Sequence, residues 1–410
     1  MTTYQSNFNS YVAFKKQSGL GSPESGSGGT IMRLSGGTPG ELTKGIIGSK
    51  EVRRDAQRTR GRHGFQKTAG GPYDGETSLG SFDDIFQALL RGAWDTELSK
   101  TSADFTTIAI ASNVLTLASG NPISLGFRVG DVIEMTGGAV AGNNSRNLRI
   151  TALTATTITV AETLVDHTED AGITLLRRGR KVIMPPVGSL VDTYFTLEER
   201  DEDIDESLLF PDIFWNAGKW SFGGPNNLLM FTPSWIGTGA MTVETAPNSP
   251  VLTSPSTPTG APYAVADATI RYGSTDLVDL TSFDLSIDMG AVAPETVNPN
   301  KISPTVLPGQ NSCTMNLTML LSDFAEISNF LNETSLSLHV LAVDNSSDPK
   351  NFLSLNVPFF TLGGAKRSPI STAGGAKTQT LSIPPDLIGQ DTAGSGYDAT
   401  MMSIQISNNS

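Results

Sequence analysis

The sequence predicts a mainly β protein of the α+β type that is built from two similar halves. Its 42 glycines and 23 prolines in 410 residues are typical of short strands joined by turns. Two stretches, 81–94 and 322–331, instead have the apolar spacing of an amphipathic helix. Each lies at a comparable place between predicted strands. We therefore expect two tandem β-sandwich or half-barrel domains, each with one flanking helix.

The N-terminal residues, 1–45, are predicted to form an extended arm. Residues 19–40 are dense in glycine, serine and proline, a composition that builds little core of its own. A basic run then covers residues 50–67, where only Glu51 and Asp55 oppose the cations. These cations are Lys50, Arg53, Arg54, Arg58, Arg60, Arg62 and Lys67.

The first predicted helix, 81–94, belongs to a first domain made of residues 46–100 and 181–245. Ser81 and Asp84 have the spacing of a capping box at its start. Its apolar residues recur at i, i+3, i+4, i+7 and i+8, so they share one face, which we expect to pack on a sheet. They are Phe82, Ile85, Phe86, Leu89 and Leu90.

Residues 101–180 differ in character from what precedes them and are predicted to be an inserted β module. Short runs of threonine, valine, isoleucine and leucine alternate with turns that contain glycine or asparagine. The pattern favours a small β-barrel or an immunoglobulin-like module that projects from a loop of the first domain. Its clearest predicted strands are 114–117, 129–135, 148–153 and 157–160.

The first domain resumes at Lys181 and carries an acidic run after a strand that begins at Tyr194. A pair of carboxylates at a strand end could serve a glycoside hydrolase. However, seven acids in nine residues repel one another and are more typical of an exposed loop. The run consists of Glu198, Glu199, Asp201, Glu202, Asp203, Asp205 and Glu206.

The second half repeats the element order of the first. A linker rich in proline, serine and threonine, 246–262, precedes a second domain at 263–410. Within it we predict strands at 279–289, 312–320, 336–343 and 352–362. The helix at 322–331 has its own apolar stripe, which we likewise expect to pack on a core; it is formed by Phe324, Ile327, Phe330 and Leu331.

Charge and cysteine content restrict the possible functions. The formal net charge of −13 disfavours a protein that clamps nucleic acid through its phosphates, whereas it suits a conduit that DNA slides past. Cys313 is the only cysteine, so no intrachain disulfide can form. The N-terminus lacks the pattern of a signal peptide, and no stretch approaches about 20 apolar residues. We expect synthesis in the cytoplasm and no membrane contact.

Known catalytic and metal-binding motifs are absent from the sequence. His63, His167 and His339 lie far apart, and there is no His-Glu-x-x-His, cysteine pair or Gly-x-Ser-x-Gly. The glycine-rich segment lacks the Gly-Lys-Ser/Thr of a phosphate-binding loop. We therefore predict a protein that is not an enzyme and has no cofactor.

Several segments of the first half resemble a known family. They are Gly-Ser-Lys-Glu-Val at 48–52, Gly-Glu-Thr at 75–77 with the helix at 82–94, the Phe127, Val129, Gly130 and Asp131 positions, and the strand at 195–199. Together they resemble the major tail tube protein of long-tailed (siphovirus-type) bacteriophages. The resemblance covers about residues 20–240, and the second half matches mainly in element order.

The resemblance implies a structural virion protein. Tube domains of this family form rings that close an inner β-barrel, and chains with two such domains form trimeric, pseudo-hexameric rings. If residues 240–410 were instead an external decoration, six chains would be needed per ring. Stacked rings would form a tube around a tape-measure protein, ending at tail terminator and distal tail proteins. DNA would pass through the tube without specific binding.

Two further interpretations follow from the sequence. We hypothesise that the basic run 50–67 meets the acidic run 198–206 across stacked rings, or that some of these carboxylates line the lumen. The alternative function is a carbohydrate-binding or adhesive β protein on a virion or cell surface, with the module at 101–180 as its binding head. Polymerisation would use the arm and the charged runs, whereas a monomeric lectin would not need them.

Overall fold

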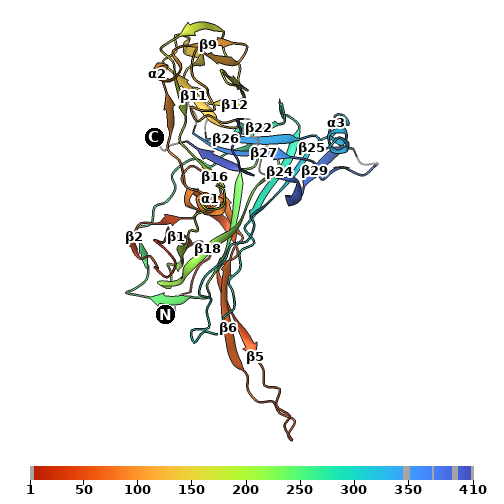
Figure 1. Cartoon of the computed structure of the whole chain (residues 1–410). Helices are drawn as coiled ribbons and strands as arrows, with labels where there is room; N and C mark the ends of the chain where they lie inside the picture. Colours follow the sequence, from red (N-terminus) through yellow and green to blue (C-terminus); the bar gives the residue numbers. More distant parts are fainter. Residues whose placement is uncertain (1–3, 345–350, 372–373, 390–395, 408–410) are drawn as a thin grey trace.

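The computed structural model describes residues 4–344, 351–371, 374–389 and 396–407. The parts of the predicted arm and second domain that fall at 1–3, 345–350, 372–373, 390–395 and 408–410 lie outside this range. The described chain is mainly β, which confirms the predicted class (Figure 1). Its helices are α1 (Asp83–Leu90), α2 (Ser102–Phe105) and α3 (Ala325–Leu331), with 3-10 turns η1 (Ala141–Asn143), η2 (Val265–Asp267) and η3 (Pro385–Leu387).

The largest sheet has 14 strands and contains residues from both halves of the chain. From one edge, its main path runs β28-β29-β25-β24-β18-β17-β1-β3, and the other strands branch from β18 and its partner β19. Its strands are β1 (Ser10–Lys16), β3 (Thr30–Ile31), β4 (Leu34–Gly37), β5 (Glu41–Ile47), β6 (Arg62–Gly70), β7 (Tyr73–Glu76), β17 (Phe195–Asp201), β18 (Glu206–Phe222), β19 (Met230–Gly237), β20 (Thr242–Thr245), β24 (Leu280–Asp288), β25 (Ser312–Leu320), β28 (Gly364–Arg367) and β29 (Thr378–Ile383).

The two halves join where β18 pairs with β24. The antiparallel register runs from Ala217 opposite Asp288 to Phe222 opposite Phe283. The alternation of β18 buries Trp220 and Phe222 on the core side of this joint, where Phe222 stacks on Phe283 at 5.5 Å between ring centroids. The halves therefore share one continuous sheet and one large apolar core.

Part of the segment predicted as an arm belongs to this sheet. β1 pairs with β17 along its whole length, from Ser10 opposite Asp201 to Lys16 opposite Phe195. Phe14 points into the core and contacts the ring of Trp215, with 5.9 Å between centroids. The structure differs from the predicted arm here because the apolar residues of β1 have a complementary core to pack against.

The two predicted helices are both present, but they differ in burial. α1 lies across the main sheet and buries Ile85, Phe86, Ala88, Leu89 and Leu90. No side chain caps its N-terminus, because the Ser81 hydroxyl donates instead to the backbone carbonyl of Ser78. α3 has no buried residue. The predicted capping box and the expected burial of the second helix are therefore wrong.

The inserted module is an eight-stranded sheet with its own core. Its strands follow the open order β14-β9-β10-β13-β12-β11-β15-β8, so these described strands do not close into a barrel. They surround an apolar core that includes Phe105 and Phe127. The strands are β8 (Leu98–Lys100), β9 (Ile108–Ala111), β10 (Val114–Leu117), β11 (Val132–Thr136), β12 (Leu148–Leu153), β13 (Thr157–Val160), β14 (His167–Asp170) and β15 (Thr174–Arg177).

A six-stranded sheet lies between the inserted module and the main sheet (Figure 1). Its order is β16-β30-β27-β26-β22-β23, so the strand that directly follows the module pairs with the last strand of the described residues. Its strands are β16 (Arg180–Ile183), β22 (Thr269–Tyr272), β23 (Thr275–Asp276), β26 (Leu336–Val343), β27 (Phe352–Phe360) and β30 (Ser403–Ile406). A small parallel pair, β2 (Gly26–Ser27) and β21 (Leu252–Thr253), completes the fold.

Candidate assembly surfaces

The basic run lies on a hairpin that projects far from the body of the molecule. Strands β5 and β6 pair from Glu41 opposite Ala69 to Ile47 opposite Arg62, and Figure 1 shows them extending away from all other elements. The base is held by a neighbouring loop, since Gln66 donates its backbone N–H to the Lys301 carbonyl at 2.7 Å. Beyond that base, the hairpin makes few contacts with the rest of the subunit.

The tip of the hairpin, residues 48–61, carries most of the cations of the run. Arg53 pairs with Asp55 at 3.0 Å, and Thr59 donates to Glu51. Among the described residues, no salt bridge joins the other tip cations to an acid; they are Lys50, Arg54, Arg58 and Arg60. Arg62 is exposed at the start of β6, and Lys67, near the base, pairs with Glu295 at 2.6 Å. The tip therefore presents unpaired positive charge to solvent.

The first two members of the acidic run lie inside the fold. Glu198 is fully buried, and its carboxylate accepts the backbone N–H groups of Val251 and Leu252 at 2.8 and 2.7 Å. Glu199 accepts from the Gly40 N–H at 2.7 Å and from the Tyr73 hydroxyl at 2.8 Å. Burial raises the pKa of Glu199 above its ordinary value. Neither carboxylate is available to a neighbouring subunit.

The other acids surround the tight turn between β17 and β18. Asp201 accepts from the Ser10 hydroxyl at 2.7 Å, and Asp205 pairs with Arg200. The Asp203 carboxylate accepts from Ser6 and Asn9, which lowers its pKa. Glu202 and Glu206 are exposed and form no salt bridge among the described residues. Two acids of the run, Asp201 and Asp203, thus order the N-terminal residues against the turn.

The structure does not bring the basic and acidic runs together within one subunit. The only cation paired with the acidic run is Arg200, which lies inside that run, and the tip of the hairpin pairs only within itself among the described residues. Any contact between the two runs would require a second copy.

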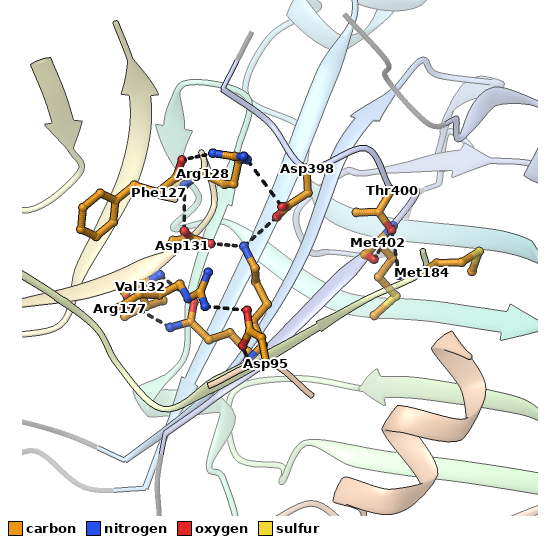
Figure 2. Close-up of polar contacts among 12 residues, drawn as sticks. Asp95, Phe127, Arg128, Asp131, Val132, Arg177, Met184, Asp398, Thr400 and Met402 are labelled. Atoms are coloured by element: carbon orange, nitrogen blue, oxygen red, sulfur yellow. Dashed lines mark hydrogen bonds and ion pairs between the residues drawn. The ribbon is translucent and has the colours of Figure 1, made fainter. Parts of the chain in front are cut away.

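A buried ionic cluster, which sequence reasoning missed, fixes the inserted module to the second half. Lys181 donates to Asp131 of the module at 2.5 Å and to Asp398 at 2.8 Å; Figure 2 shows these two carboxylates facing one another. Beside it, Arg177 pairs with Asp95 at 2.5 Å. Burial by itself lowers the pKa of Lys181, but the two carboxylates outweigh it and raise the pKa overall. The lysine is therefore charged.

Two further contacts support the same joint. Arg149 of the module bridges to Asp276 of β23 at 2.7 Å, and Gln405 of β30 accepts the Val132 N–H at 2.8 Å. Gly130 has a φ of +92°, and a Cβ there would lie 2.3 Å from the Asn356 amide, so only glycine permits the approach. The module was expected to project from the first domain. In the structure the module also contacts the second half of the chain, through β23, β27 and β30.

The described residues offer little other chemistry. No group of three or more histidine, cysteine, aspartate or glutamate side chains in the described ranges could hold a metal ion. The Cys313 thiol is buried, and burial raises its pKa to about 12. Three of the four tryptophans, Trp215, Trp220 and Trp235, are buried core residues, so they offer no stacking surface to a sugar. No helix in the described part is long and apolar enough to span a membrane.

These features define a structural β protein whose surfaces are suited to assembly: a projecting charged hairpin, a sheet shared by two halves, and exposed sheet edges. The chain belongs to the phage tail tube protein family, whose model matches residues 7–391. It is therefore a structural protein of the phage virion that assembles into the tail tube. A comparison with curated proteins finds no match.

Proposed function

We propose that the chain forms trimeric, pseudo-hexameric rings that stack into the tail tube around a tape-measure protein. The observation that carries this proposal is the continuity of the main sheet across both halves, together with a family match that spans both. Two tube-like halves per chain would require three chains for a sixfold arrangement. Pairing of free strand edges such as β28 with a neighbour would remove them from solvent.

The hairpin formed by β5 and β6 is the proposed contact between successive rings. Its tip carries unpaired cations and projects farther from the body than any other element of the described residues (Figure 1). A head-to-tail contact of this kind does not close on itself, so it propagates into a filament. The exposed acids Glu202 and Glu206 are candidates for the same contact or for the lumen wall. Arg54, Arg58, Arg60 and Lys50 are the cations best placed for it.

DNA ejection through the tube is the proposed outcome of this assembly. The acidic net charge limits binding of the phosphate backbone, so DNA would pass without specific recognition. The tail terminator and distal tail proteins are the proposed partners at the two ends. The family match favours this function over a carbohydrate-binding or adhesive protein, and no feature of the described residues supports that alternative.

Negative-stain electron microscopy combined with light scattering tests the proposal. The purified protein, once concentrated, is expected to form hollow tubes or stacked rings whose mass per ring equals three chains of 43.3 kDa. A ring mass of six chains would refute the trimer and assign residues 240–410 to an external role. A monomer that never stacks at any concentration would refute tube formation by this chain alone.

The Arg58→Glu, Arg60→Glu and Arg62→Glu variant tests the role of the hairpin. It is expected to form rings but not tubes, because like charges replace attraction at the contact between rings. The matched control replaces the same three residues with lysine, which keeps the charge, and should still form tubes. Tubes of normal length from the glutamate variant would refute an ionic role for the hairpin.

A further inference from the structure

A large groove lies at the end of the molecule opposite the basic hairpin. Its volume is about 1090 Å³, at the upper limit of typical small-molecule pockets, which span about 300–1,000 Å³. One wall comes from the inserted module at Gly130 and Ile150, and the other from the segment before β24 and from α3. Figure 1 shows the module and α3 at one end and the hairpin formed by β5 and β6 extending from the other.

The groove has an excess of negative charge. Four acids line it, against one arginine, Arg271, which already pairs with one of them, Asp276, at 3.1 Å. The three others have no cationic partner among the described residues; they are Asp279, Asp323 and Glu326. Carboxylates clustered in a partly enclosed groove attract a cationic ligand more strongly than isolated surface acids do.

Two other features of the groove indicate that it binds something. Gln379 lines it and is 2 % exposed, yet its Nε2 donor has no acceptor among the described residues. Such an unpaired donor is costly, so an acceptor supplied by a ligand would be favourable. Val278 and Leu320 also lie on the groove with exposed apolar side chains, at 99 % and 39 %.

The hairpin tip has complementary properties. It offers unpaired arginines for the carboxylates, backbone carbonyls for the Gln379 amide, and the exposed apolar side chain of Val52 for the apolar rim. Arginine is especially suited to such contacts because its guanidinium binds a carboxylate in two-pronged fashion. From these matches we propose that the groove beside α3 binds the basic hairpin tip of a second copy of this chain.

This inference rests on the proposed stacking of rings and names the receptor of the contact. The hairpin and its receptor lie at opposite ends of the subunit. Each added copy therefore leaves one of the two surfaces free to bind a further copy, so the assembly can continue to grow. It also assigns a role to the inserted module, which supplies one wall of the groove. The acidic turn between β17 and β18 is then not the principal partner of the hairpin.

A cysteine cross-linking experiment on assembled tubes tests the proposal. One variant carries Ala56→Cys at the tip and Ser322→Cys on the groove, both exposed positions, while the native Cys313 is buried. A comparison variant combines Ala56→Cys with Ile204→Cys in the acidic turn. Mild oxidation followed by a non-reducing gel should yield a ladder of multimers from the groove variant, and none from either single variant.

The outcomes separate this inference from the proposed function. Tubes by electron microscopy with a ladder only from the groove pair support it. Tubes with a ladder only from the acidic-turn pair, or with no ladder, overturn the groove as receptor and leave the tube function standing. Absence of both tubes and ladders from chains that retain the wild-type circular dichroism spectrum overturns both.

A charge exchange provides a second, independent readout. The Asp279→Lys, Asp323→Lys variant should lose tube formation, and combining it with Arg58→Glu and Arg60→Glu should restore it. The matched control, Asp279→Asn with Asp323→Asn, removes charge without reversing it and should lower tube yield less. Failure of the combined variant to regain tubes, when each parent forms rings, would contradict a direct ionic contact.

Discussion

The sequence predicts one helix at a corresponding place in each half. The two helices differ sharply in how many apolar residues they bury. α1 buries five apolar residues, whereas α3 buries none. Phe86 of α1 is 1 % exposed and packs against the rings of Trp220 and Phe231, while Phe330 of α3 is 39 % exposed. The difference arises because α1 crosses the face of the sheet near its middle, whereas α3 lies at its outer end (Figure 1). A similar apolar stripe thus supports the core in one half and faces solvent in the other.

Removing the aromatic ring of Phe86 should cause the largest loss of stability. Phe86→Ala would leave a cavity beside the rings of Trp220 and Phe231, and such truncations cost about 3–5 kcal/mol. Denaturant unfolding followed by tryptophan fluorescence, carried out below the concentration at which tubes form, would measure the change. A loss below about 1 kcal/mol would mean that α1 does not depend on this packing, and the contrast with α3 would fail.

The ionic cluster at Lys181 couples the two halves, and its removal should have the second-largest effect. Lys181→Met leaves the buried Asp131 without its cation, a change that costs about 3 kcal/mol or more. Limited proteolysis should then release the inserted module sooner. The control is Lys219→Met, which breaks an exposed pair with Asp284 and should cost at most about 1 kcal/mol. Equal effects from both variants would show that burial of the cluster has no energetic importance.

Acid should weaken the second half selectively, because His339 is buried there. Burial, and then the nearby Arg149, lower its pKa to about 3, with Arg271 acting in the same direction and Asp276 opposing. The ring accepts or donates one hydrogen bond with Ser354 at 2.7 Å. Since the unfolded chain binds a proton below a pH of about 6.5 and the folded chain does not, stability falls as the pH drops through this window.

His339 is expected to lower the free energy of unfolding by about 1.4 kcal/mol per pH unit below about 6.5, or by about 2 kcal/mol at pH 5. Unfolding curves at several pH values would measure it. His339→Gln removes the titrating group, so its stability should depend less on pH by this amount. An identical pH dependence in the variant and the wild type would show that the histidine does not remain neutral in the folded state.

Much of the fold could be predicted from local sequence patterns. Five predicted strands coincide with strands of the structure, because alternating β-branched and aliphatic residues bounded by turns are typical of β-strands. They are 114–117, 148–153, 157–160, 312–320 and 336–343, which correspond to β10, β12, β13, β25 and β26. The two helices were found by the same periodicity. Burial of α3 was predicted wrongly, since periodicity identifies an apolar face but does not say whether the fold places anything opposite it.

The assembly surfaces were less accessible to prediction. The exposed basic tip follows from a run of like charges, which cannot be buried without partners. The same reasoning misjudged the acidic run, where Glu198 and Glu199 occupy strand positions that face backbone N–H donors. The groove and the Lys181 cluster join residues more than 100 positions apart, such as Lys181 and Asp398. Their only local signals are a lysine at the return from the module and a Gly-Asp turn at 130–131.

The smallest effect is expected for Phe330→Ala, the counterpart of Phe86→Ala. Truncating a side chain that is 39 % exposed and lies outside the buried core should change the unfolding free energy of the single chain by less than about 0.5 kcal/mol. Leu331, which is 72 % exposed, should behave in the same way. Unfolding under the conditions used for Phe86→Ala would provide the comparison, and a loss near 2 kcal/mol would show that α3 is covered within the chain.

The stability of Phe330→Ala should be measured both in the single chain and in assembled tubes. In the single chain, the helix gains its stability from the backbone and from contacts such as Arg367 over the Phe324 ring at 5.2 Å, neither of which Phe330 supplies. In assembled tubes a neighbouring copy could cover the stripe, and Phe330→Ala would then lower the thermal stability of tubes while leaving that of the single chain unchanged. Equal and negligible effects in both states would mean that the α3 stripe stays in solvent, and that the two halves differ in assembly as well as in packing.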